Sequence, residues 1–546
     1  MANQGETTAW EDDQVYELEK EKKETYTVYF VLFSVLLTTV LVLSKVLHEY
    51  RSLNKVLSEA ALVLILSMVV GFFVNVFLST EVDEGEDVGQ LAKKLLSFSP
   101  NVFFMALLPP IIFNSGYMLR RELFYRHISP ITLFAAVGTT CSALVCAGLL
   151  WAVQQIGIFG DFSPKALELL AFGSLIAATD TVSVIAVLQK KRVDPHLFYV
   201  VFGESALNDA VALVLFNTFA HLLRDQLEFG AMSVVHFLLD FLRQAVGSPA
   251  LGICFGAAAA LMFKTINFRK HEFRMLELSL YLICMYLPFM LAELLHLSGI
   301  VAIFFAGLSV RRYASPNVSL ETSQAGETIF KVAAFLAETC IFIELGLSIF
   351  GFSGSFHWMF CLCALLACLL GRAAAIYPLS YAYNYSLREL PVEESKEIPL
   401  APSPSDVSKQ SGISSGSFTS RKKRGRRRTP IQRKDKKISV EMAHVLWFAG
   451  LRGAVAYACV REFPDVYGHD DEFTAATMLI ILFTVMIMGG GTEYLLEYLG
   501  IEMGVDEEQY MFEWRKEHEL KGRFHDLGKW FEIVGPSKCR QSIMLF

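Results

Sequence analysis

Charged residues are scarce in this sequence: they make up 19% of its 546 residues, whereas hydrophobic residues make up 53%. A soluble domain of this length carries more charge and fewer apolar residues. The net charge of −7 gives no reason to expect a nucleic-acid partner. Residues 1–25 lack the basic stretch and short apolar core that a cleaved signal peptide needs. The composition therefore favours a protein built into a membrane.

Cysteines in polar loops are also lacking, because nine of the ten cysteines lie inside apolar runs. A secreted disulfide framework would place them in polar loops. The close pair Cys361 and Cys363 has no companions at the spacing of a zinc motif. We expect the cysteines to pack as small apolar residues between helices, and we expect no cofactor.

Long apolar runs are abundant. A bilayer core about 30 Å thick is crossed by about 20 apolar residues in a helix. About thirteen runs are candidates by this rule, although 298–311 is short, and they lie near residues 26–47, 57–79, 101–119, 127–151, 166–189, 197–225, 231–264, 274–296, 298–311, 329–352, 356–384, 439–462 and 472–498. The run 231–264 contains Gly247, Ser248 and Pro249, so it is either one long tilted helix or two short ones. We predict an all-α polytopic membrane protein with about thirteen transmembrane helices.

Loop charge orients these spans, because basic residues collect in cytosolic loops. Threading thirteen spans with the C-terminus in the cytosol places most basic loop residues there, among them Arg120, Arg121, Lys190, Lys191, Arg192, Arg311 and Arg312. The opposite side receives acidic residues such as Glu81, Asp83, Asp161, Asp465 and Asp470. The segregation predicts a lumenal or extracellular N-terminal segment, 1–25, and membrane domains at 26–389 and 438–500.

Two polar segments lie outside these domains. Residues 390–437 are rich in proline, serine, glycine and charge, so we expect a disordered cytosolic loop. Its basic end, Arg421–Lys437, is suited to anionic lipid, and a topogenic or merely solvated charge run is an equal alternative. Residues 501–546 form a short cytosolic tail without a catalytic signature.

One predicted span carries acidic residues that are costly at mid-bilayer and therefore indicate function. Glu204 and Asn208 lie four residues apart on one helix face, and Ser205 and Asp209 share the adjacent face. Oxygen ligands of this kind suit a hard cation such as Na⁺ or K⁺. Burial also favours the protonated form of a carboxylic acid. A site at Asp209 that binds either a proton or a cation is sufficient for exchange.

The preceding span contains Thr179, Asp180 and Thr181 at its middle. Such side chains replace backbone hydrogen bonds with their own, as a locally unwound helix requires. A single Asp facing a neighbouring helix is the simpler alternative. Arg452 occupies the equivalent place in the twelfth span, between Gly450 and Gly453. This arrangement predicts two inverted six-helix repeats with crossed unwound helices, as in secondary transporters.

Intramembrane arginines need carboxylate partners. We predict that Arg452 pairs with Glu204 and that Arg372 forms a structural pair with Glu338. The other polar residues in the spans, including Glu344 and His444, are expected near the interfaces or in packing roles.

Several motifs together resemble the sodium/proton exchangers of the eukaryotic NHE/NHX type, within the cation/proton antiporter superfamily. They run in order along nearly the whole membrane region, at 108–117, 178–180, 203–210, 337–339, 371–373 and 450–454. The stretches 113–117, 489–492 and 504–506 are most similar to the endosomal and Golgi branch. The chain departs from the family at Thr181, where the family has a helix-breaking proline.

The resemblance implies a role for each matching position. Asp209 is the principal proton and cation carboxylate, and Asn208 marks electroneutral exchange. Thr179 and Asp180 line the crossing of the unwound helices, Ser205 and Glu204 complete or brace the site, and Arg452 holds Glu204 and Asn208. Alternating access and a homodimer are further implications of the family.

Other functions stay open at this level. An electrogenic antiporter would have Glu204 or Asp180 titrating as well. A cation channel lacks a filter-like loop or a repeated arginine ladder here, and a non-transporting sensor would not need the acidic site. The sequence does not decide between Na⁺ and K⁺, because small differences in site geometry set that preference.

Overall fold

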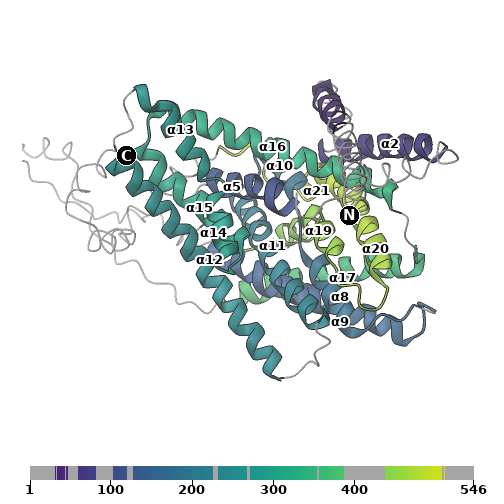
Figure 1. Ribbon diagram of the computed structural model, residues 1–546. Helices are drawn as coiled ribbons and strands as arrows, with labels where there is room; N and C mark the ends of the chain where they lie inside the picture. The colour runs from purple at the N-terminus through teal and green to yellow at the C-terminus, as the bar shows by residue number, and fades with distance from the viewer. Residues whose placement is uncertain are drawn as a thin grey trace, which may run out of the picture.

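The computed structural model describes residues 33–43, 59–80, 103–119, 127–160, 162–224, 231–266, 271–352, 356–386 and 437–506, together with a few isolated residues between and after these ranges. Every regular element in these ranges is a helix (Figure 1). The predicted segment 1–25, the loop 390–437 except Lys437, and most of the tail 501–546 lie outside the described residues. The predictions for those three segments therefore stay predictions.

The helices follow the predicted spans closely. In the first half of the chain they are α2 (Glu59–Thr80), α5 (Leu108–Met118), α7 (Ile128–Thr132), α8 (Thr139–Gln155), α9 (Ala166–Ala177), α10 (Val182–Lys191), α11 (Pro195–Arg224) and α12 (Ala231–Thr265). In the second half they are α13 (Arg274–Ile283), α14 (Leu287–Leu294), α15 (Gly299–Ser309), α16 (Leu320–Gly351), α17 (Trp358–Ser386), α18 (Val440–Phe448), α19 (Ala454–Arg461), α20 (Asp470–Phe483) and α21 (Gly490–Tyr498). Short π-helical turns join α7 to α8 at Leu133–Gly138 and α20 to α21 at Thr484–Gly489.

Seven continuous helical stretches in the described residues are long and apolar enough to cross a membrane. They are Ile128–Gln155, Pro195–Arg224, Leu242–Thr265, Arg274–Leu294, Leu320–Phe350, Trp358–Ser386 and Asp470–Tyr498. Shorter apolar helices occupy other predicted spans, including Phe33–Leu43 and Ala60–Val76. The all-α polytopic class is confirmed, while the count of thirteen stays a prediction.

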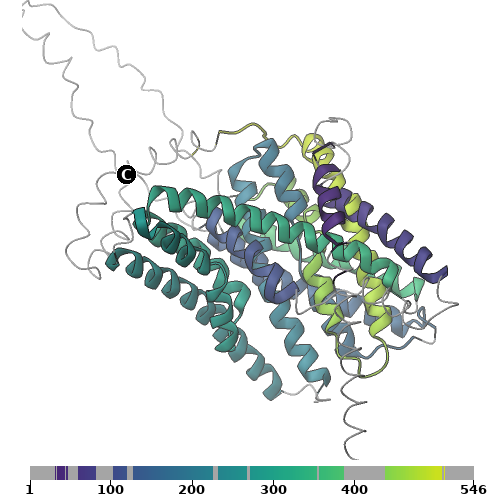
Figure 2. The same cartoon turned by 45° about the horizontal axis from the view of Figure 1, so that its top comes forward.

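The run with two alternatives is one helix, because α12 continues through Gly247, Ser248 and Pro249. The Ser248 hydroxyl accepts a hydrogen bond from the backbone amide of Ser298, at 3.0 Å. In Figures 1 and 2 this long teal helix runs along one flank of the bundle, and the yellow-green helices α19 and α20 lie toward the other. In chain order, α12 lies between the two groups of six predicted spans, so it is the linker between the predicted repeats.

Packing around the linker repeats itself between the two halves. The second and third spans of the first repeat are α2 and α5, and their counterparts in the second repeat are α15 and α16. The α2 helix packs along α16, and α15 packs along α5, so one contact occurs twice with the repeats exchanged. The fourth spans, α8 and α17, pack on each other, as a two-fold relation requires. This pairing agrees with the predicted inverted repeats.

The contact between α5 and α15 brings two backbones very close together. A Cβ atom added at Gly116 would overlap the Phe304 carbonyl, and one at Gly307 would overlap the Phe113 carbonyl. Small residues at such crossings let helices approach within a membrane, where packing replaces the hydrophobic effect as the driving force. The two glycines therefore fix the distance between the helices of this scaffold.

Candidate functional site

Two helices are interrupted at the same place in the bundle. The first break, residues 178–181, separates α9 from α10, and the second, residues 449–453, separates α18 from α19. The Asp180 amide donates a hydrogen bond to the Leu451 carbonyl at 2.9 Å, so the two breaks touch. The predicted crossing of unwound helices is confirmed, and residues 178–181 form the first break without a proline. The hydrogen bond from Asp180 ties this break to the second one.

Arg452 binds the end of the opposite broken helix. Its Nη1 atom donates to the carbonyls of Ala177 and Ala178, at 2.8 and 3.0 Å. These carbonyls lose their helical partners where α9 stops, and a cation at a helix C-terminus also complements the helix dipole. Its Nε atom donates to Cys368 Sγ at 3.2 Å, and its amide donates to Thr484 Oγ1 at 3.0 Å. Arg452 is therefore the C-terminal cap of α9.

The buried ion pair of the site joins Glu204 on α11 to Arg372 on α17. The two contacts are 2.6 Å from Nη1 to Oε1 and 2.8 Å from Nη2 to Oε2. The predicted pairing of Glu204 with Arg452 is wrong, because the Arg452 guanidinium is committed to the carbonyls of α9. The predicted pairing of Arg372 with Glu338 is also wrong, because both terminal nitrogens of Arg372 contact Glu204. Glu338 lies half-buried on α16.

Arg372 also donates a hydrogen bond to the end of a broken helix. Its Nη2 atom donates to the Leu446 carbonyl in the last turn of α18, at 3.0 Å. Each half-helix that ends at the crossing thus has a buried arginine at its carbonyl end. The arrangement supplies donors that the interrupted helices would otherwise lack.

The glycines of the second break are required by close contacts. A Cβ at Gly453, just before α19, would overlap the Asp180 carboxylate. A Cβ at Gly450 would lie 2.9 Å from Arg372 Nε. Asp180 therefore lies against the N-terminus of α19, where a negative charge complements the helix dipole. At both glycines the nearest atom belongs to a side chain, so these two positions make room for the Asp180 carboxylate and the Arg372 guanidinium.

Side chains on the α11 face predicted to carry the site form hydrogen bonds to Thr179 in the first break. Ser205 Oγ donates to the Thr179 carbonyl at 3.0 Å. Asn208 Nδ2 donates to Thr179 Oγ1, and also to Glu204 Oε1 at 3.3 Å. The Thr179 amide approaches Asn208 Oδ1 at 3.5 Å. The structure thus brings Thr179, Asn208, Ser205 and Glu204 together, with Asn208 between the ion pair and the break.

Asp209 is the remaining carboxylate on this face. Its side chain is 8% exposed, and its Oδ1 atom has no hydrogen-bond partner among the described residues. The charges that act on it most strongly are Asp180 and Glu204, which are negative, and Arg452, which is positive. Asp209 therefore lies within electrostatic reach of the crossing and has an oxygen without a partner among the described residues.

Two residues that hold Arg452 escaped the sequence predictions. Cys368 precedes Arg372 by four residues, so it lies one turn away on the same face of α17, and this spacing was a usable signal. Thr484 stands alone among apolar residues near the end of α20, which is a weaker signal. Its hydroxyl accepts from the Arg452 amide and donates to the Ile481 carbonyl at 3.2 Å.

A model of a known protein family matches most of this sequence. Residues 33–498 match the family model described as sodium/hydrogen exchanger, transmembrane. The chain belongs to the sodium/hydrogen exchanger family. The match spans both crossed breaks, the α11 face and both buried arginines, so the whole candidate site of this exchanger lies within it.

Relatives of the exchanger cover most of its length. It is 34% identical over 489 residues to human sodium/hydrogen exchanger 8, covering 89% of this chain and 73% of that protein. It is 32% identical over 443 residues to sodium/hydrogen exchanger 9 of Equus caballus, covering 79% of this chain and 60% of that protein. The sodium proton antiporter MjNhaP1 of Methanocaldococcus jannaschii is similar in fold, with a TM-score of 0.57 at 14% identity, covering 87% of this chain and 100% of that one.

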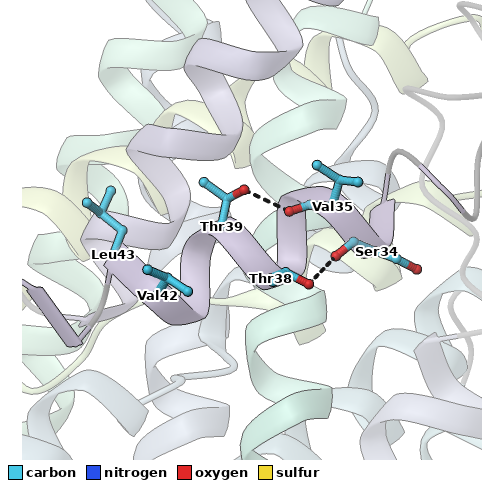
Figure 3. A pocket seen from close by; sticks show the side chains of 6 residues that line it. All are labelled: Ser34, Val35, Thr38, Thr39, Val42 and Leu43. Atoms are coloured by element: carbon cyan, nitrogen blue, oxygen red, sulfur yellow. Dashed lines mark hydrogen bonds between the residues drawn. The ribbon is translucent and has the colours of Figure 1, made fainter.

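A pocket elsewhere on the exchanger does not compete with this site. Figure 3 shows its lining residues, all from the helical segment Phe33–Leu43: Ser34, Val35, Thr38, Thr39, Val42 and Leu43. The Thr38 and Thr39 hydroxyls donate to the Ser34 and Val35 carbonyls, each at 2.8 Å. None of these side chains titrates, so the described lining of the pocket offers no group for proton exchange.

Proposed function

We propose that the exchange of a proton for Na⁺ or K⁺ takes place at Asp209 and is electroneutral. The observation that carries the proposal is the balance of charge in the crossing. Arg372 neutralises Glu204 through two short contacts. The negative Asp180 and the positive Arg452 offset each other at the ends of the broken helices. Asp209 is the carboxylate left over, so the site has room for one added positive charge.

A site that accepts one positive charge can exchange a proton for a monovalent cation. A proton or a monovalent cation can neutralise the Asp209 carboxylate, but the two compete for the same oxygen atoms. The unpartnered Oδ1 atom supports direct ligation, since hard cations take carboxylate and hydroxyl oxygens as ligands. Asn208 and Ser205 hold the unwound segment through Thr179, and the Asp180 carboxylate acts on Asp209 as a neighbouring negative charge. Alternation of this site between the two membrane faces completes the cycle.

The purified protein in liposomes tests this proposal. We expect an imposed Na⁺ or K⁺ gradient to drive proton flux, and we expect Asp209→Asn to abolish it. The matched control is Glu441→Gln, at an exposed carboxylate at the start of α18, which should keep the wild-type rate. Intact flux in Asp209→Asn would show that the exchange site lies elsewhere.

An electrogenic antiporter is the second candidate, because Asp180 is close enough to act on Asp209. Flux measured at several clamped membrane potentials separates the two. Electroneutral exchange predicts the same rate at each potential. A rate that changes with potential would favour the electrogenic alternative, and running the assay with each cation also gives the preference between Na⁺ and K⁺.

Three further expectations concern the cellular context. We propose that the protein works as a homodimer in endosomal or Golgi membranes, which rests on its resemblance to that branch. The basic run Arg421–Lys437 would bind anionic lipid from the cytosolic side. Native mass spectrometry, imaging of a tagged chain, and flotation with vesicles that contain or lack phosphatidylserine test these in turn.

A further inference from the structure

A second buried oxygen in the crossing has no assigned role. The Thr181 side chain is fully buried, and its Oγ1 atom has no hydrogen-bond partner among the described residues. Buried polar groups in native proteins nearly always have a partner, because leaving one without a partner destabilises the folded protein. A hydroxyl in the break without a partner among the described residues therefore points to a bound ligand.

The place of Thr181 at the start of α10 strengthens the argument for a ligand. Thr181 is the N-cap residue of α10, and its carbonyl accepts the first helical hydrogen bond, from Ile185, at 2.8 Å. A threonine at an N-cap normally accepts a hydrogen bond from an amide in the first turn. The Thr181 side chain makes no such bond. The backbone of Thr181 is thus held by the helix, while its hydroxyl makes no capping hydrogen bond.

Thr181 also lies next to the groups that define the site. Asp180, the preceding residue, is the charged group that acts most strongly on Asp209. Thr179, two residues earlier, is held by Ser205 and Asn208 on the same α11 face. Thr181 and Asp209 thus each have a buried oxygen that lacks a partner among the described residues. Oxygen ligands from a hydroxyl and a carboxylate are what an alkali cation takes.

We propose that the Thr181 hydroxyl is a further ligand of the transported alkali cation, together with Asp209 Oδ1. This rests on the proposed function of Asp209. A hydroxyl is neutral, so it strengthens cation binding without changing the charge carried in each cycle. A proton on Asp209 needs no such ligand. Thr181 therefore favours the cation over the proton.

The test is Thr181→Val, which keeps the shape and removes the hydroxyl, with Thr181→Ser to restore it. In liposome flux, Thr181→Val should raise the apparent KM for the cation by about tenfold, as expected for losing a polar contact to a charged group. Because proton affinity is untouched, the factor should be the same at pH 6.5 and pH 8. Thr181→Ser should return to near the wild-type KM.

The control is Thr477→Val, a buried threonine on α20 whose hydroxyl donates to the Phe473 carbonyl at 2.8 Å. It should leave KM unchanged. A second readout is the rise in Tm that saturating Na⁺ or K⁺ gives the purified protein, which should shrink in Thr181→Val because ligand binding stabilises the folded state.

The outcomes separate the two proposals. A wild-type KM in Thr181→Val, a factor that depends on pH, or a Thr181→Ser that behaves like Thr181→Val would each overturn the role of the hydroxyl. Those results would leave exchange at Asp209 standing. No cation-driven flux in the wild type, or intact flux in Asp209→Asn, would overturn the proposed function itself.

Discussion

Removal of Arg372 should leave Glu204 as a buried, uncompensated charge. Glu204 is fully buried and Arg372 is 3% exposed, and both guanidinium nitrogens of the fork contact the carboxylate. Breaking such a buried pair from one side costs about 3 to 5 kcal/mol. We therefore expect Arg372→Gln to lower the free energy of unfolding by that amount. The conservative Arg372→Lys should also be damaging, because lysine lacks the fork that makes both contacts.

Neutralising the partner should recover most of the loss. In Arg372→Gln with Glu204→Gln no charge is left unpaired, so the remaining cost is about 1 kcal/mol, for the lost bond to the Leu446 carbonyl. Unfolding of the purified variants in mixed micelles, followed by tryptophan fluorescence, gives the four free energies of the cycle.

A parallel cycle between Glu204 and Arg452 provides the control. Its coupling energy should be clearly smaller, because Arg452 donates to the carbonyls of Ala177 and Ala178 and not to Glu204. A coupling between Glu204 and Arg452 as large as that between Glu204 and Arg372 would refute the assignment of the ion pair.

Two glycine substitutions test the close contacts in the bundle. Gly453→Ala would press a Cβ atom into the Asp180 carboxylate, so we expect a loss of about 1 to 3 kcal/mol of stability and slow flux; wild-type flux would contradict the described crossing. Gly307→Ala should lower the stability by a similar amount, because its Cβ atom would push α15 away from α5. The control is Gly148→Ala, whose Cβ atom would meet no atom within 4 Å, and it should melt at the wild-type temperature. Equal melting temperatures for Gly307→Ala and Gly148→Ala would show that the scaffold tolerates a wider spacing between α5 and α15.

The sequence was sufficient for the helices and for the acidic face of α11. Apolar run length predicts the spans because the bilayer sets that length, and the four-residue spacing places Glu204 and Asn208 on one face. The two breaks were also predictable, because polar residues and glycines at mid-span mark places where a helix stops.

The partners of the two arginines were not predictable from side chains alone. The sequence shows two intramembrane arginines and several carboxylates, and opposite charge suggests pairing Arg452 with Glu204. The choice is made by acceptors that the sequence does not display, the backbone carbonyls of Ala177, Ala178 and Leu446. These groups become available only where helices end, so the correct pairing depends on the crossing in three dimensions.

The cap that Arg452 places on α9 has a consequence for biosynthesis. Arg452 and the Ala177 carbonyl are 275 residues apart in the chain. At about 5 to 20 residues per second, the ribosome needs on the order of tens of seconds to deliver the missing donor. Until then α9 sits in the bilayer with its terminal carbonyls open. A nascent chain released before the second repeat emerges would therefore be a substrate for membrane quality control, however well its first six spans had inserted.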